Sequence, residues 1–273
     1  MWQGVSPRGG YRFARCRAEN QPALIAYITA GDPSLERTVS LVEAMELGGA
    51  DLIELGVPFS DPIADGPVIM RATERALAHG ASLAGVLEVA RKIRERSQIP
   101  ILLFSYLNPL LRYGFDRLAQ DAAAAGIDGI LMTDASVEEA GKFVPVVRAA
   151  GLDTVFLAAP TSPMERLKQV AAYSSGFVYL VSRTGVTGVR DQLAGSAAEL
   201  VERMRTVTDL PLAVGFGIAK AADAAAVARI ADGVVVGSAF VRIIEDSAGS
   251  LELEGRLEAF TRELKMGAKA GRA

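Results

Sequence analysis

The 273-residue chain has a single cysteine, Cys16, a single histidine, His79, and a single tryptophan. One cysteine cannot form an intramolecular disulfide, and one cysteine with one histidine cannot build an ordinary zinc site. No run of apolar residues approaches the ~18–20 residues that a membrane-spanning helix needs. We therefore expect no disulfide scaffold, no metal site and no membrane span.

Neither positive nor negative charge dominates the composition. The formal net charge is −3, charged residues make up 22% of the chain and hydrophobic residues 50%. No basic patch indicates a nucleic-acid partner, and the mild acidity does not favour an anionic membrane surface. This balance is typical of a soluble globular protein, and without an export signal we expect it in the cytoplasm.

The two ends differ from the rest of the chain. Residues 1–18 hold four arginines and no acid, which faintly resembles a transit peptide, but glycines interrupt them and serine is scarce. We expect residues 1–21 to be a basic lead-in that packs against the fold. Residues 265–273 are expected to be a flexible tail. One catalytic domain, residues 22–264, would lie between them.

From residue 22 onward, short apolar runs alternate with stretches of helical periodicity such as 34–47, 83–96 and 197–207. The predicted strands are Ala23–Thr29, Leu52–Val57, Ile99–Phe104, Gly129–Thr133, Thr154–Ala158, Phe177–Val181, Leu212–Gly215 and Gly233–Val236. Eight strands alternating with helices predict a (β/α)8 TIM barrel of one domain. A doubly wound open sheet is the alternative, but the near-even spacing favours closure.

Glu54 is the most informative residue. It interrupts the apolar run Leu52–Val57, which has no polar face and is typical of a strand covered on both sides. Such a carboxyl group must be paired, hydrogen-bonded or raised in pKa toward neutrality, where it can donate and accept protons. The alternative is a structural glutamate that caps the next helix or pairs with an arginine. Buried carboxyl groups concentrate at functional sites, which favours catalysis.

A second acid, Asp65, follows in the loop 59–67, which contains two prolines and Gly66. In a barrel, the carboxyl ends of the strands and the loops after them form the active-site face, where both acids would lie. An apolar strand and a polar loop push the pKa values of two carboxyl groups apart, as different roles require. The alternative for Asp65 is the N-cap of a helix over residues 67–79.

Glycine-containing segments follow the last three predicted strands, at 182–188, 215–218 and 237–239. Loops in these places, with a helix N-terminus, form the common phosphate site of this fold. We expect backbone amides of Gly217, Gly237 and Ser238 to supply it, with Ser238 opening a helix. The long polar segment 182–195 is predicted to be a mobile lid, the alternative being a disordered connection. No nucleotide-binding motif is present.

Six segments of the chain resemble the sequence motifs of one known family. In chain order they are Y-I-T-A-G-D-P (27–33), I-E-L-G-V-P-F-S-D-P-I-A-D-G-P (53–67), Y-L-N-P (106–109), Y-L-V-S-R-T-G-V-T-G (179–188), G-F-G-I (215–218) and G-S-A-F-V (237–241). They resemble the tryptophan synthase alpha subunit family in its own order. The resemblance implies a lyase that cleaves indole-3-glycerol phosphate to indole and glyceraldehyde 3-phosphate without a cofactor. It also implies a beta subunit that receives the indole for L-tryptophan synthesis, in a heterotetramer.

The same resemblance assigns roles to residues. The family's catalytic glutamate falls on Glu54, and its aspartate that holds the indole N–H falls on Asp65. Substrate-binding positions fall on Tyr27, Thr29, Tyr179 and the lid residue Thr187. Phosphate-binding positions fall on Gly188, Phe216, Gly217, Gly237 and Ser238. For Tyr179 the alternative is ordinary barrel packing.

Two positions depart from the family. Tyr27 stands where phenylalanine is usual, so its hydroxyl needs a partner or solvent. Ser136 stands where proline is usual, which leaves open the shape of the loop after the fourth strand and part of the subunit interface. Apolar residues on the expected rim are predicted to be exposed for the partner: Phe59, Ile63, Pro109 and Leu110.

Other functions share parts of this pattern. A sugar-phosphate isomerase would also bind phosphate, as would the synthase of indole-3-glycerol phosphate, which is expected to use lysines that the predicted strands lack. A catalytically silent scaffold would not need Glu54 and Asp65. A stand-alone indole-producing lyase would keep the same residues, and indole release measured with and without a partner separates it.

Overall fold

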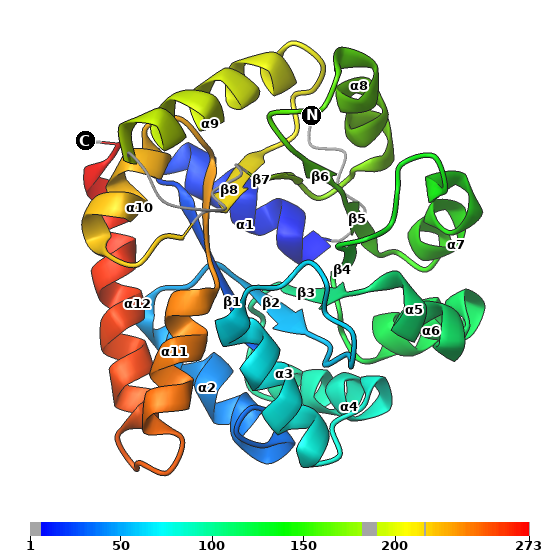
Figure 1. The fold of residues 1–273 in the computed structure, drawn as a ribbon, viewed down its shortest axis with the longest axis vertical. Helices are drawn as coiled ribbons and strands as arrows, with labels where there is room; N and C mark the ends of the chain where they lie inside the picture. The colour runs from blue at the N-terminus through cyan, green and yellow to red at the C-terminus, as the bar shows by residue number, and fades with distance from the viewer. Residues whose placement is uncertain (1–6, 182–189, 216, 273) are drawn as a thin grey trace.

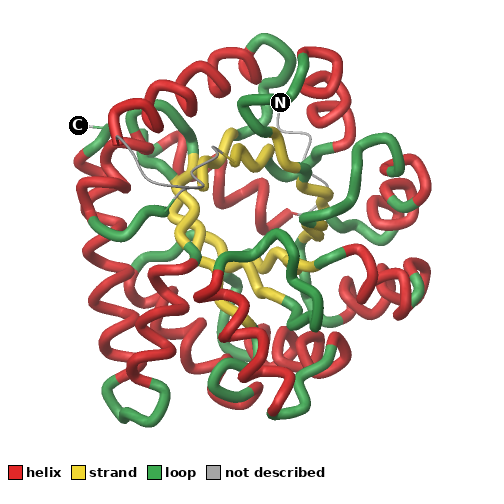
Figure 2. The backbone as a smooth tube through the Cα atoms, in the orientation of Figure 1, coloured by secondary structure: helices red, strands yellow, loops and turns green. Residues whose placement is uncertain are grey.

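The computed structural model describes residues 7–181, 190–215 and 217–272. All strand pairs within them are parallel, in the order β5-β4-β3-β2-β1-β9-β8-β7-β6. The strands are β1 Ala23–Thr29, β2 Leu52–Gly56, β3 Ile101–Ser105, β4 Gly129–Met132, β5 Asp153–Val155, β6 Leu157–Ala158, β7 Val178–Val181, β8 Leu212–Gly215 and β9 Gly233–Val236. Because β5 pairs with β4 and β6 with β7, the broken segment Asp153–Ala158 closes the sheet into a barrel (Figure 2). The predicted (β/α)8 fold is confirmed.

Helices surround this barrel in Figure 1. They are α1 Pro7–Ala18, α2 Leu35–Gly48, α3 Pro67–Ala78, α4 Leu83–Arg94, α5 Leu107–Tyr113, α6 Phe115–Ala124, α7 Val144–Ala149, α8 Met164–Tyr173, α9 Arg190–Arg205, α10 Ala221–Ala228, α11 Ser238–Ser247 and α12 Leu253–Ala270, with a short 3-10 helix at Ala140–Lys142. In the described part of the chain, none of the helices is long and apolar enough to cross a membrane.

The strands are apolar throughout because each of their faces meets a different core. In β1, Leu24 and Ile28 belong to the outer core between the sheet and the helices, whereas Ile25 belongs to the core inside the barrel. Successive side chains of a strand point to opposite faces, so covering both faces requires an apolar residue at nearly every position. A polar residue on the inner face, such as Glu54, is therefore an exception that the fold must accommodate.

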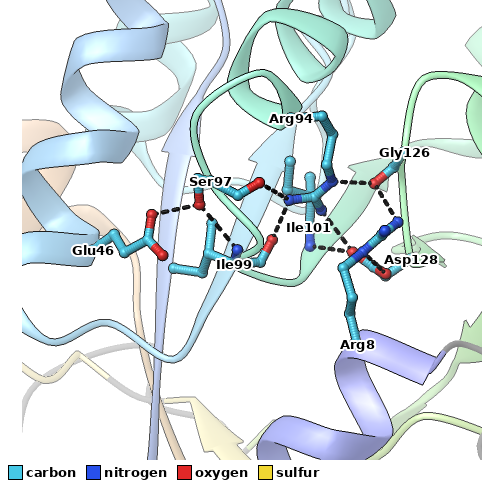
Figure 3. Close-up of polar contacts among 8 residues, drawn as sticks. All are labelled: Arg8, Glu46, Arg94, Ser97, Ile99, Ile101, Gly126 and Asp128. Atoms are coloured by element: carbon cyan, nitrogen blue, oxygen red, sulfur yellow. Dashed lines mark hydrogen bonds and ion pairs between the residues drawn. The ribbon is translucent and has the colours of Figure 1, made fainter.

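The basic lead-in forms α1, which crosses the amino-terminal end of the barrel and is visible through it in Figure 1. Phe13 is 5% exposed and its ring centroid lies 5.5 Å from that of Phe177. Arg8 Nε and Arg94 Nη2 each donate to a carboxylate oxygen of Asp128 at 2.7 Å (Figure 3). Asp128 directly precedes β4, so these contacts anchor α1 at the end of the barrel opposite the strands' carboxyl ends.

The prediction of a flexible tail over residues 265–273 is wrong as far as residue 270, because α12 continues to Ala270. Its last turns are held by distant contacts. Lys265 Nζ donates to the Pro22 carbonyl oxygen at 3.0 Å and pairs with Asp51, and Ala268 is buried. Gly267 is buried as well, so these turns of α12 pack against the fold.

The predicted lid 182–195 overlaps α9, so the prediction of a loop is wrong for its last six residues. α9 begins at Arg190, so residues 190–195 are helical rather than part of a loop. Residues 182–189 lie outside the described residues, and so do three site predictions, Thr187, Gly188 and Phe216.

Candidate active site

Glu54 lies in the middle of β2, in register with Tyr27 of β1 and Leu102 of β3. Leu102 belongs to the core inside the barrel, and residues in register share a face, so Glu54 points inward. Its side chain is 1% exposed, and its Oε1 has no hydrogen-bond partner among the described residues. Burial raises the pKa of Glu54 to about 8. Neither an arginine nor a helix cap satisfies this oxygen there, and the carboxyl group is protonated at neutral pH.

Two tyrosines extend toward the carboxyl ends of the strands beside Glu54. The Tyr27 hydroxyl lies 3.3 Å from Thr29 Oγ1, so the extra hydroxyl finds a partner. Tyr27 Oη would lie 2.5 Å from a Cβ at Gly56, and the Tyr179 hydroxyl would collide with a Cβ at Gly215. Because glycine has no Cβ, these two positions leave room for the tyrosine hydroxyl groups.

Burial raises the pKa of both phenols, and nearby carboxylates add to it, chiefly Asp65 for Tyr27 and Glu54 for Tyr179. Both tyrosines therefore stay neutral, and their hydroxyl groups lie near the acids, Tyr27 near both and Tyr179 near Glu54. Tyr179 also packs on the apolar core inside the barrel, so packing and a place in the site coexist in this residue.

Asp65 lies in the loop before α3 and is half-buried. The Tyr106 hydroxyl donates to Asp65 Oδ2 at 3.0 Å and accepts from the Ala64 amide at 3.0 Å. Burial raises the pKa of Asp65 to about 6, and the hydrogen bond from Tyr106 opposes that rise. The N-cap of α3 is Gly66, with no side-chain cap bond, so the helix-cap alternative for Asp65 is wrong. Asp65 is an anion above about pH 6.

Tyr106 is a site residue that the sequence analysis did not identify as one. It directly follows β3 and is only 3% exposed, with its ring centroid 5.4 Å from that of Phe59. Its motif, Y-L-N-P, was recognised as part of the family resemblance. Nothing local in that motif shows that the hydroxyl reaches a loop 41 residues earlier.

The residues expected to bind phosphate lie at the carboxyl ends of two neighbouring strands. β8 and β9 are paired, and Gly217 and Gly237 come just after them, so both stand at the carboxyl ends of the strands. Gly217 has φ +28 and is exposed, and a Cβ added there would meet nothing within 4 Å. Gly237 is the N-cap of α11, without a side-chain cap bond, and Ser238 is its exposed first residue. The first amides of a helix carry partial positive charge and bind anions well.

The arrangement is suited to proton transfer on a substrate whose anionic group is bound by the backbone amides at the carboxyl ends of the strands. One carboxyl group is protonated at neutral pH and the other is ionised, which separates an acid from an electrostatic stabiliser. Within the described residues, no group of three or more His, Cys, Asp and Glu side chains is placed to hold a metal ion.

The rim of the barrel carries exposed apolar side chains, though not all of those expected. Ile63 is 86% exposed, whereas Leu110 is fully buried, so the prediction that Leu110 faces a partner is wrong. The neighbouring Leu111 is 55% exposed. α5 turns one side of its surface into the core, and the two leucines fall on opposite sides of that division. In the loop after β4, the Glu139 amide donates to the Ser136 carbonyl oxygen at 3.1 Å.

Comparison with known proteins places this geometry in one family. The family model described as tryptophan synthase alpha chain matches residues 13–269. A tryptophan synthase alpha chain from Solibacter usitatus is 64% identical over 260 residues, 95% of this chain and 97% of that protein. One from Geotalea daltonii is 48% identical, over 94% of this chain and 97% of that protein.

Solved structures of tryptophan synthases also resemble this chain. Tryptophan synthase from M. tuberculosis in an aminoacrylate-bound form has a chain with a TM-score of 0.86 and 39% identity, covering 96% of this chain and 99% of that one. Tryptophan synthase subunit alpha from Legionella pneumophila has a TM-score of 0.88 and 37% identity, covering 96% and 98%.

Proposed function

This chain belongs to the family of tryptophan synthase alpha chains, and we propose that Glu54 and Asp65 are the acids that perform the family's reaction in it. It is a lyase that cleaves indole-3-glycerol phosphate to indole and glyceraldehyde 3-phosphate, and it works with a beta subunit in L-tryptophan synthesis. The observation that carries the residue assignment is Glu54 itself, a buried carboxyl group on the inner face of the barrel with its pKa raised to about 8.

Glu54 acts first as an acid and then as a base. Its carboxyl proton passes to indole C3, which leaves a cationic indolenine that still carries the glycerol phosphate chain. The resulting carboxylate takes the proton of the hydroxyl group next to C3. The carbon–carbon bond then breaks, its electron pair returns to the ring to give indole, and the hydroxyl carbon becomes the aldehyde. Glu54 ends protonated, as it began, and a pKa near the working pH suits both transfers.

Asp65 stabilises the charge that forms between these transfers. As an anion above about pH 6, it faces the indole N–H while the ring is cationic. Tyr106 restrains this carboxylate through the hydrogen bond to Oδ2, and its bond from the Ala64 amide holds the loop. A fixed anion needs little reorganisation at the moment of reaction, which is the source of its effect.

The phosphate anchors the other end of the substrate. Backbone amides of Gly217, Gly237 and Ser238 supply donors, aided by the positive end of α11. The family resemblance adds residues outside the described ones: Gly188 and Phe216 at the phosphate and Thr187 on the lid. Tyr27, Thr29 and Tyr179 line the substrate in this proposal.

No cofactor is needed for this sequence of steps, because Glu54 moves both protons and Asp65 meets the developing charge. We also keep the cytoplasm as the proposed compartment, since the pathway's substrate is a phosphorylated metabolite. The exposed rim residues Ile63 and Leu111 are the proposed contacts with the beta subunit in a heterotetramer.

The direct test is to incubate the purified protein with indole-3-glycerol phosphate and to follow indole release, with and without the cognate beta subunit. We expect release by the protein alone and faster release in the complex, because a partner that orders the loop around Asp65 completes the site. No indole under either condition would refute the assignment. Equal rates, with no complex by light scattering, would indicate a stand-alone lyase.

A further inference from the structure

Away from the proposed catalytic residues, four charged side chains form a continuous network over α3 and α11. Arg75 Nε and Nη2 donate to the two carboxylate oxygens of Asp32 at 2.9 and 2.8 Å. Arg75 Nη1 donates to Glu245 Oε1 at 2.8 Å. Arg71 donates to both oxygens of Glu245 at 2.7 and 2.8 Å. Arg75 is therefore the only one of the four that joins the two carboxylates.

The Asp32 end of the network is buried, so it differs from a surface ion pair. Asp32 is 1% exposed and follows β1, in a loop that packs tightly on the second half of α3. A Cβ at the neighbouring Gly31 would lie 2.7 Å from Ala81 Cβ and 3.3 Å from Ala76 Cβ. A carboxylate in such a place requires a partner, and a planar guanidinium that binds both of its oxygens is the best one.

The Glu245 end joins two helices that each lead from a different part of the proposed site. α3 begins two residues after Asp65, and α11 begins at Ser238 in the phosphate cradle. The two helices pack against each other and lie side by side in Figure 1. The pairing with Arg71 and Arg75 lowers the pKa of Glu245 to about 2, so this bridge stays ionised throughout the working range.

The contact between the two helices combines apolar and charged side chains. Near the site, Val68 and Ala72 of α3 and Val241 of α11 form one apolar cluster with Tyr27. Arg71 and Arg75 come one turn after Val68 and Ala72 in α3, and Glu245 comes one turn after Val241 in α11. Residues three or four apart lie on one face of a helix, so the apolar contact and the ionic bridge form a single seam. Arg71 binds both oxygens of Glu245, and Arg75 links Glu245 to the buried Asp32, whose two oxygens it binds.

We propose that Arg75 is a positioning residue that holds α3 against α11, and so sets the distance between Asp65 and the phosphate cradle that the substrate spans. This inference rests on the proposed function. A ligand that touches both ends of the site depends on that distance, whereas a ligand that touches one end does not. Small misplacements of reacting groups by distant residues reduce rates strongly.

The test compares three ligands on two variants. Inorganic phosphate reaches the cradle, indole reaches the Asp65 end, and a non-cleavable indolyl-alkyl phosphate reaches both. For Arg75→Met and for Glu245→Ala, we expect the Kd of the spanning ligand to rise about tenfold, while the Kd values of phosphate and of indole change less than about twofold. Glu245→Ala keeps the Asp32–Arg75 pair, so it reports on the bridge even if Arg75→Met does not fold.

Arg91→Met is the matched control, because Arg91 pairs on the surface with Glu88 of the same helix at 2.9 Å. Arg75→Lys keeps the charge without the fork, so we expect a partial rise in the spanning ligand's Kd. Equal weakening of all three ligands, or a spanning-ligand Kd for Glu245→Ala that matches the control, would overturn the proposal. The wild-type protein is assayed in parallel for indole release, and failure there would count against the proposed function rather than against Arg75.

Discussion

The proposed reaction depends on one residue, a carboxyl group that is buried away from water. Glu54 is buried on the inner face of the barrel and its pKa is raised to about 8 from an ordinary value of 4.5. The folded protein therefore holds this proton more tightly than the unfolded chain does. Between these two pKa values the unfolded chain loses the proton first, so Glu54 makes the free energy of unfolding fall as the pH rises.

The first prediction follows from that linkage. Glutamine has the shape of glutamic acid without the titration, so Glu54→Gln should be more stable than the wild type at pH 8, by roughly 1–3 kcal/mol. The difference should shrink toward pH 5, where glutamate is protonated in the folded protein. Urea unfolding at both pH values measures it, with the exposed Glu199→Gln as control. A difference that does not change with pH would contradict the raised pKa.

The second prediction concerns Tyr106. Tyr106→Phe removes the hydroxyl that donates to Asp65, so the pKa of Asp65 should rise further and kcat/KM should begin its increase at a higher pH. Loss of a hydrogen bond to a charged group should reduce kcat/KM at pH 7 about tenfold. Tyr113→Phe is the control, since the Tyr113 hydroxyl bonds Asp121 outside the site at 2.6 Å. An unshifted pH profile would show that Tyr106 does not restrain Asp65.

Sequence reasoning located these residues unequally. Glu54 stands out because an acid conflicts with the apolar strand around it, and Asp65 because of its motif. Tyr106 conflicts with nothing in its own segment, and its role exists only once the loops after β2 and β3 are folded together. The same holds for the Tyr27–Thr29 pair, whose hydrogen bond depends on the side-chain positions inside the barrel.

At the scale of strands and helices, the local sequence pattern predicts that an element exists better than it predicts where that element begins and ends. The strands Ala23–Thr29, Leu212–Gly215 and Gly233–Val236 were predicted with the bounds that they have. The predicted strand 154–158 is instead split at Phe156, because its two halves pair with different neighbours in closing the barrel. The tail predicted from residue 265 is helical up to Ala270, since the last turns of α12 are stabilised by a contact with a residue more than 200 positions away.

The third prediction concerns α1. Phe13→Ala leaves a gap against Phe177 inside the amino-terminal end of the barrel, and should lower the free energy of unfolding by ~3–5 kcal/mol. Activity of the folded variant should stay near the wild-type value, because the site is at the opposite end. Urea unfolding and indole release measure the two effects, and Ala14→Ser on the exposed side of α1 is the control. A loss of kcat/KM with unchanged stability would contradict this division of the barrel.

At the scale of the whole molecule, the two ends of the barrel have separate tasks. The amino-terminal end is closed by α1 and by arginine–aspartate pairs such as those on Asp128. The carboxyl end carries the two acids, the proposed phosphate cradle and the exposed apolar residues Ile63 and Leu111. In the proposed function, substrate chemistry and partner contact therefore share one rim. Sequence reasoning predicts that both functions share one rim. It names Leu110 as exposed instead of Leu111, because the packing of the short helix α5 decides which of its sides faces the solvent.

The fourth prediction tests that rim. Leu111→Ser replaces a half-exposed apolar side chain and should raise the Kd of the beta-subunit complex about tenfold or more. Indole release by the isolated protein should not change. Leu251→Ser is the control, because Leu251 is 99% exposed and lies between α11 and α12. Calorimetry or light scattering with the beta subunit provides the measurement, and equal affinities of the two variants would place the interface elsewhere.

The central claim is that Glu54 moves the protons, and Glu54→Gln tests it most directly. The variant keeps the size of the side chain and cannot titrate, so indole release should fall by ~10²–10⁴ or more. Binding of a non-cleavable indolyl-alkyl phosphate should stay close to the wild-type affinity, because the phosphate cradle and Asp65 are untouched. Turnover near the wild-type rate, by a variant verified to bind that ligand normally, would contradict the account.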